Sequence, residues 1–121
     1  MKRIYIAGKV SNLPEQEVLA KFGNAQSAIE LLGFEVVNPM TLVKTHIKEH
    51  FLNQPLTDAE IWELAIKVCI KAMIDCDGVV VLPCWNDSKA AKIERQLADD
   101  LDMQIFSYTS FGLKVLKANL L

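Results

Sequence analysis

One carboxylate is unusual because of the residues that surround it in the sequence. Glu94 follows Ala90 by four positions and precedes Leu97 and Ala98 by three and four. This spacing places the carboxylate on the apolar face of a predicted helix, turned towards the interior. Burial there costs several kcal/mol unless the carboxylate has a partner. Because buried carboxylates in clefts are enriched for function, Glu94 is the leading candidate for a catalytic residue.

Two structural explanations of Glu94 remain open from the sequence. The first is a capping box with Ser88. This motif needs the acid three residues after the capping residue, and that position is Ala91, which argues against it. The other explanation is a salt bridge with Arg95 or a neighbouring lysine at the edge of the apolar face. Either one would give Glu94 a purely structural role.

The segments that must position Glu94 alternate between strands and helices. Short apolar runs predict strands at residues 3–8, 34–37, 78–83 and 103–106. Apolar residues at steps of three and four predict helices at residues 14–32, from 57 or 58 to 74, from 87 or 88 to 101, and at 110–118. Residues 40–55 are predicted to be irregular or weakly helical.

This alternation predicts an α/β fold: a three-layer α/β/α domain, flavodoxin-like or Rossmann-like, with a small parallel sheet in the order 2-1-3-4. All 121 residues form a single predicted domain. In that order the first and third strands are neighbours, and ligands bind beyond their carboxyl ends. We therefore expect the site between residues 8–12 and 84–88.

Composition narrows the classes of partner and compartment. The net charge is −2 and the basic residues are scattered, so no nucleic-acid polymer is expected as a partner. No apolar run reaches the roughly 20 residues of a membrane span, and the first strand is too short for a signal peptide. Three cysteines indicate reduced thiols, and we expect a cytoplasmic protein.

We expect neither a metal nor a cofactor. His46 and His50 have the spacing of two ligands on a helix, but no cysteine lies near them. The spacing of Cys69, Cys76 and Cys84 lacks the paired two-residue gaps of structural zinc sites. Cys84 lies in the expected site loop as an alternative nucleophile, yet no His or Asn stands near it in sequence to activate it.

Several segments, in the same order and with similar spacing, resemble the nucleoside 2-deoxyribosyltransferase-like superfamily, most closely an often phage-borne branch of it. The segments are IYIAGKVSNLP from Ile4, GFEVVNP from Gly33, CDGVVVLP from Cys76 and WNDSKAAKIERQLA from Trp85. The resemblance spans about residues 4–106.

The resemblance implies cleavage of the N-glycosidic bond of a nucleoside or a nucleoside 5′-monophosphate, by hydrolysis or by transfer to a second base. Glu94 matches the nucleophile, which would form a covalent glycosyl-enzyme and give net retention. Tyr5 matches the tyrosine that positions this glutamate. Ser88 matches a Ser or Asp that holds the nucleophile or a sugar hydroxyl.

Substrate-binding residues also follow from the resemblance. Trp85 would stack on the base or sugar, although it is equally a loop aromatic that covers the core. Gly8 would allow close backbone approach. A 5′-phosphate would meet Lys9 and Ser11, with help from the helix start at Ser88. Asp87, which directly precedes Ser88 in the loop, is also predicted to bind the substrate.

Two other aromatic residues have a simpler interpretation. Trp62 is interpreted as a packing residue. Tyr5 would be interpreted in the same way if Glu94 were not in the sequence.

Two positions depart from the superfamily pattern. Ala90 stands where the family has Gly. Cys69 stands where active members carry an Asp, eight residues before the aspartate of the C-D pair, Asp77. If that Asp protonates the leaving base, this protein is impaired, uses another acid, or takes another substrate. Asp75 is near the helix end, and Asp77 is expected to be structural.

Two rivals to the glycosidase hypothesis remain. One is a non-catalytic nucleotide-binding or sensor module, and the other is a structural oligomerisation domain, which leaves Glu94 unexplained. In each case we expect a homo-oligomer, a dimer or larger, as family members form. The C-terminal segment is more apolar than one inward face requires, through Phe111, Leu113, Val115, Leu116, Leu120 and Leu121.

Overall fold

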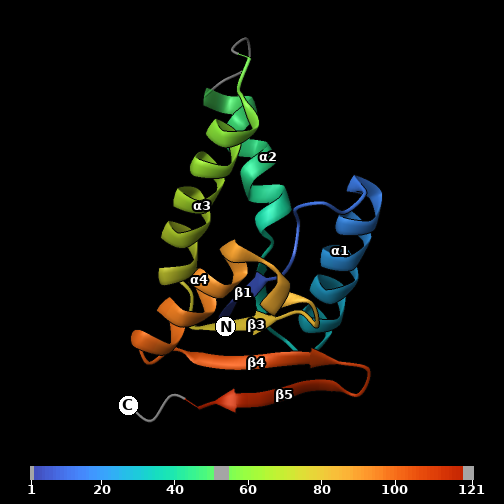
Figure 1. Ribbon diagram of the computed structural model, residues 1–121. Helices are drawn as coiled ribbons and strands as arrows, with labels where there is room; N and C mark the ends of the chain where they lie inside the picture. Colours follow the sequence, from blue (N-terminus) through green and yellow to red (C-terminus); the bar gives the residue numbers. More distant parts are fainter. Residues whose placement is uncertain (1, 51–54, 119–121) are drawn as a thin grey trace.

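The computed structural model describes residues 2–50 and 55–118. Its strands are β1 (Arg3–Ala7), β2 (Glu35–Val37), β3 (Gly78–Val81), β4 (Gln104–Thr109) and β5 (Gly112–Lys117). Its helices are α1 (Glu15–Leu31), α2 (Pro39–His50), α3 (Asp58–Ile74) and α4 (Lys89–Asp100), with a 3₁₀ turn η1 at Trp85–Asp87 (Figure 1). No helix in these ranges is long and apolar enough to cross a bilayer.

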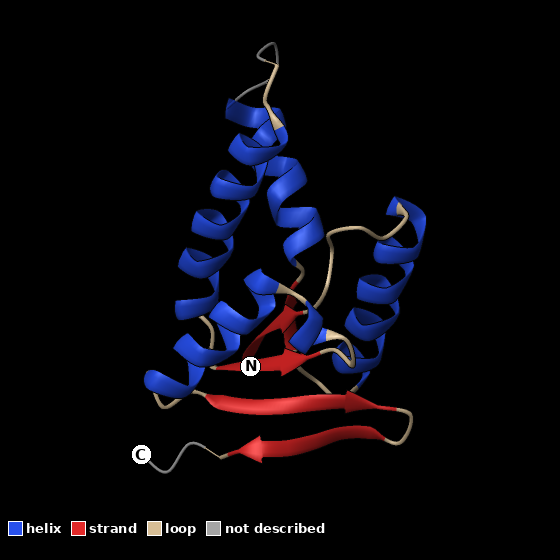
Figure 2. Cartoon of the chain, viewed as in Figure 1, coloured by secondary structure: helices blue, strands red, loops and turns tan. Residues whose placement is uncertain are grey.

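The strands form one sheet in the order β2-β1-β3-β4-β5. The first three pairings are parallel, and β5 joins β4 antiparallel. Helices cover both faces, as Figure 2 shows, and this arrangement confirms the three-layer α/β/α prediction and the order 2-1-3-4. β1 and β3 are neighbours, so their carboxyl ends meet at one edge of the sheet.

Alternation along β1 sends successive side chains to opposite faces of the sheet. Ile4 and Ile6 pack with α1, against Phe22 and its neighbours. Tyr5 and Ala7 face the other way, into a cluster with residues of α3 and α4. The first strand therefore contributes to two separate cores, and Tyr5 lies on the α3–α4 side.

The prediction of a helix at residues 110–118 is wrong. These residues form β5, which follows a tight turn after β4. The backbone at Gly112 has a φ of +112°, in the region that favours glycine, and the Thr109 hydroxyl donates to the Gly112 carbonyl oxygen at 2.8 Å. Leu113 and Val115 alternate with Lys114, which is the period of a strand.

Residues 40–50 are more regular than expected, because α2 runs from Pro39 to His50. Residues 51–54 of the same prediction lie outside the described residues. Asn38 starts this helix: its side-chain oxygen accepts a hydrogen bond from the Met40 N–H at 3.0 Å. Thr57 caps α3 in a capping box with Glu60, one of the two starts that the sequence allowed.

Candidate active site

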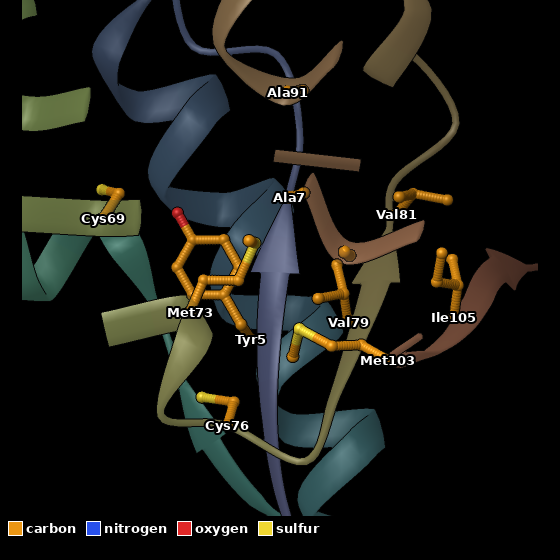
Figure 3. Close-up of a cluster of buried hydrophobic side chains, with 11 residues drawn as sticks. Tyr5, Ala7, Cys69, Met73, Cys76, Val79, Val81, Ala91, Met103 and Ile105 are labelled. Atoms are coloured by element: carbon orange, nitrogen blue, oxygen red, sulfur yellow. The ribbon is translucent and has the colours of Figure 1, made fainter. Parts of the chain in front are cut away.

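Three side chains from three elements meet beneath the carboxyl ends of β1 and β3. They are Tyr5 of β1, Cys69 of α3 and Glu94 of α4, and all three are buried. The Tyr5 hydroxyl donates a hydrogen bond to Glu94 Oε2. Figure 3 shows the Tyr5 ring beside the sheet, with its hydroxyl turned towards Cys69. We call these three residues the floor.

Burial of Glu94 confirms the prediction that it faces inward: only 4% of the residue is exposed, between Ala91 and Ala98 on the same face of α4. Neither structural explanation fits it. Ser88 caps α4 by accepting from the Ala91 N–H, as the spacing indicated. Among the described residues Glu94 forms no ion pair, and Arg95 instead lies over the Trp85 ring.

The environment of Glu94 changes its acidity. Desolvation raises the pKa of its carboxyl to about 7, and the hydrogen bond from Tyr5 lowers it by a smaller amount. Near neutral pH the carboxyl therefore exists in both forms. A side chain with this property can act either as a nucleophile or as a proton-transfer group.

The other two floor residues remain uncharged near neutral pH. Burial first, and then the Glu94 charge, raise the pKa of the Tyr5 hydroxyl well above its usual value. Burial raises the pKa of the Cys69 thiol to about 11, while interaction with Tyr5 acts in the opposite direction. Glu94 is therefore the floor residue whose charge changes around pH 7.

A cavity of about 860 Å³ opens above the floor. Its volume lies within the roughly 300–1,000 Å³ of small-molecule sites. Apolar side chains of α2 and α3 form one wall, which we call the apolar wall: Met40, Val43, Ile47, Trp62, Ala65 and Ile66. The rim carries polar side chains: Ser11, Asn12, Glu15, Lys44, Asp58 and Ser88.

A smaller and more polar cavity of about 240 Å³ adjoins the first, and we call it the annex. Lys9, Asp87 and Lys89 line the annex alone, while both cavities share Ser11, Asn12, Trp62, Ser88 and Ala90. The first residues of α4 therefore border both spaces. Helix N-termini carry partial positive charge and favour anions.

The structure brings together most of the residues that the sequence singled out. Tyr5, Gly8, Ser11, Ser88 and Glu94 line the main cavity. Lys9 and Asp87 line the annex instead.

Gly8 also has a packing reason to be glycine. A Cβ at Gly8 would lie 2.8 Å from Leu82 Cδ1, too close for an ordinary contact. The absence of a side chain at Gly8 therefore lets the chain leave β1 close to the end of β3.

Trp85 is not among the residues that line either cavity. It packs against the core cluster on the α3–α4 face, and the Arg95 guanidinium lies 4.9 Å from its ring centroid. This placement favours the alternative interpretation of Trp85, a loop aromatic that covers the core.

Sequence reasoning missed Trp62 as a site residue. Trp62 lines both cavities, and Lys89 Nζ lies 4.9 Å from its ring centroid. Its position on the flank of a helical stripe had suggested packing. The apolar wall of α2 was also missed, although Met40, Val43 and Ile47 are spaced by three and four residues, as on one helix face.

Two other expectations from the sequence concern a structural role for Asp77 and a possible metal site at His46 and His50. Asp77 accepts a hydrogen bond from the Arg3 N–H at the amino end of β1, which fits its expected structural role. Within residues 2–50 and 55–118, no cluster of three or more His, Cys, Asp or Glu side chains could hold a metal ion. His46 lies on α2, and the His50 side chain is outside the description.

Fold and geometry together define an α/β protein with a ligand pocket where its two central parallel strands end, and with a buried carboxylate in the pocket floor. The chain belongs to the family described as "Domain of unknown function (DUF4406)", whose model matches residues 2–107. This match contains the floor and both cavities and ends before β5. No curated protein and no solved structure matches the chain.

Proposed function

We propose that this protein breaks the N-glycosidic bond of a nucleoside or nucleotide through a covalent intermediate on Glu94, as a glycosidase or a deoxyribosyltransferase. One observation carries the proposal: a buried carboxylate, held by Tyr5, forms the floor of a cavity of about 860 Å³. The superfamily resemblance adds the bond type, because Glu94 and Tyr5 match its nucleophile and positioning tyrosine.

The proposed reaction has two displacements at one carbon. A Glu94 carboxylate oxygen attacks the anomeric carbon, the bond to the base nitrogen breaks, and its electron pair leaves with the base. Water or a second base then attacks the same carbon and releases the Glu94 carboxylate, which gives net retention. Tyr5 holds Oε2, which leaves Oε1 to attack. The ionised form of Glu94 is the reactive one.

The substrate has a natural orientation in this pocket. Its sugar would lie above the floor, near Ser88, and its base would lie against the apolar wall beside Trp62. A 5′-phosphate would reach the annex, where Lys9 and Lys89 lie near the start of α4. The proposed partner is therefore a small molecule, and the proposed reaction needs no cofactor.

The test is Glu94→Gln, which preserves shape and packing but cannot form a stable glycosyl ester. We expect base release from nucleosides and 5′-monophosphates, followed by chromatography, to fall by about a thousandfold or more, with ligand binding retained. A 2-fluoro-2-deoxy nucleoside should leave its added mass on the peptide that contains Glu94. Added mass on Cys84, or turnover by the Gln variant, would contradict the mechanism.

A second candidate is a binding or sensor module that keeps the pocket without the reaction. The observation in its favour is Cys69, which lines the floor where the resemblance implies an Asp. Nucleotide binding by the wild-type protein without any base release would establish this alternative.

We further propose that the protein assembles as a homo-oligomer through β5. This strand is at one edge of the sheet, so its outer backbone groups can pair antiparallel with β5 of a second copy. Val115, Leu116 and Phe111 are exposed on or beside it. Leu120 and Leu121, also named from the sequence, lie outside the described residues. A monomer by light scattering at micromolar concentration would refute the assembly.

We also infer a cytoplasmic location, because Cys69, Cys76 and Cys84 are free thiols, as a reducing compartment keeps them. A tagged protein recovered outside the cytoplasm would contradict it.

A further inference from the structure

The floor is short of proton donors for the proposed reaction. Glu94 is the buried charged side chain of the described residues, and as nucleophile it must be ionised. The Tyr5 hydroxyl is already engaged with Glu94. Cys69 is the third floor residue, and burial keeps the pKa of its thiol at about 11, so it is a weak acid near neutral pH.

The other carboxylates of the cavities lie at the edge of the site. Glu15 and Asp58 line the rim, each in the first turn of its helix, and both are exposed. Asp58 precedes Cys69 by eleven residues of α3, which is about 16 Å along the helix axis. Asp87 is exposed in the annex. The buried floor therefore has no second carboxylate among the residues that the structure describes.

Leaving-group chemistry makes this arrangement selective. An ordinary purine or pyrimidine leaves an anomeric carbon as an anion unless an acid protonates it, and a positioned acid contributes about 10²–10⁴-fold. A base that already carries a positive charge on its glycosidic ring system needs no proton. It departs as a neutral molecule when the bond breaks.

We propose that the site acts on N-glycosides of cationic bases, such as pyridinium nucleotides or N-alkylated purine nucleotides. The inference rests on the proposed function and names its substrate class. The Glu94 carboxylate forms a bond to the anomeric carbon, and the electron pair of the broken bond neutralises the ring. Water then adds at the same carbon, the ester bond breaks to restore the carboxylate, and one proton passes to solvent.

Trp62 supplies an independent reason for the same class. Its ring borders both cavities and is occupied on one face by the Lys89 ammonium, 4.9 Å from the centroid. Tryptophan is the side chain that attracts cations most strongly through its ring face. A cationic base can replace the Lys89 ammonium there, which leaves Lys89 available to a phosphate in the annex.

The experiment compares a matched pair of substrates, 7-methylguanosine 5′-monophosphate and guanosine 5′-monophosphate, in ribo and deoxy forms, with nicotinamide mononucleotide as a second cation. Each rate is divided by the uncatalysed rate of the same compound, because cationic bases are intrinsically labile. We expect the wild-type acceleration to be about 100-fold or more larger for the cations.

Variants at Cys69 sharpen the comparison. Cys69→Asp should restore an acid and raise release of the uncharged base about tenfold or more, whereas Cys69→Ser should not. The wild-type substrate ratio tests the inference even if the Asp variant does not fold. Equal acceleration of charged and uncharged bases would overturn this inference alone. Loss of all release in Glu15→Gln or Asp58→Asn would do the same, since a rim acid would then supply the proton. Inertness towards every compound would overturn the proposed function as well.

Discussion

The two faces of the sheet are built from the same strands but differ in chemistry. On the α1 face, Ile4, Ile6 and Phe22 belong to a buried cluster of apolar side chains. On the α3–α4 face, neighbouring positions of the strands support Tyr5, and with it a buried carboxylate and a buried thiol. Ile4 and Tyr5 are adjacent in β1, yet Ile4 packs in an apolar cluster and Tyr5 lies in the candidate active site.

The difference shows how a small domain can contain a carboxylate whose burial is unfavourable. Desolvation of a carboxylate opposes folding, and the hydrogen bond from Tyr5 offsets only part of that effect. The buried cluster on the α1 face is apolar and stabilises the sheet by apolar burial. Changes on the two faces should therefore have different consequences.

The largest expected effect on stability comes from the α1 face. Phe22 is fully buried, so Phe22→Ala should lower the free energy of unfolding by about 3–5 kcal/mol, measured by urea denaturation. Leu19→Ala, at an exposed position of the same helix, is the matched control and should change stability by about 0.5 kcal/mol or less. Nucleotide binding by the folded fraction should persist in both variants. Equal losses in the two variants would contradict the assigned role of this face.

On the other face, Glu94→Gln should increase stability in a pH-dependent way. Folding raises the pKa of Glu94 from 4.5 to about 7, so the folded state binds the additional proton between these values. Wild-type stability therefore falls as pH rises from about 4.5 to 7, by roughly 3 kcal/mol in total. The Gln variant should not show this loss, so it should be more stable than the wild type at pH 8 and about equally stable near pH 4.

The control for this experiment is Glu30→Gln, at an exposed position of α1. It removes one negative charge from the surface without touching the floor, and should change stability by about 0.5 kcal/mol or less. If the Glu94→Gln variant were less stable than the wild type at pH 8, Glu94 would instead be held by a favourable contact.

The smallest effect concerns Tyr5 alone. The hydrogen bond from Tyr5 lowers the pKa of Glu94, so Tyr5→Phe should raise that pKa further. Base release should then require a more alkaline pH, with its lower midpoint shifted by the same amount. Tyr108→Phe, a half-buried tyrosine on the α1 face, should leave the midpoint in place. An unshifted midpoint in the Tyr5 variant would separate the hydroxyl from the titrating group.

Much of this fold could be predicted because its signals are local. The apolar runs of β1 and β3, and the caps at Thr57 and Ser88, depend on neighbouring residues. The segment at 110–118 was predicted wrongly because its apolar residues fit two periods over so short a length. What makes it a strand is its pairing with β4 and the contact of Lys117 with Asp99, and neither is visible in sequence spacing.

The site was predicted in part for a related reason. Helical periodicity was enough to predict that Glu94 faces inward, and the strand order was enough to predict that it lies near residues 8–12. Trp62, interpreted from the sequence as a packing residue, borders both cavities, because a helical wheel cannot say which flank of α3 borders a cavity. For Trp85 the sequence left two interpretations open, and the structure favours the one in which it covers the core. The apolar wall forms where α2 packs against α3, and the annex forms where the loop after β1, the start of α4 and Trp62 of α3 come together.

The hydrogen bond between Tyr5 and Glu94 also bears on how the chain folds. Its partners are 89 residues apart in sequence, whereas β4 and β5 are joined by a short turn and can pair locally. Closing the longer loop costs more chain entropy. The β4–β5 hairpin contains none of the floor residues, so the proposed chemistry of Glu94 requires β1, α3 and α4 to have packed together.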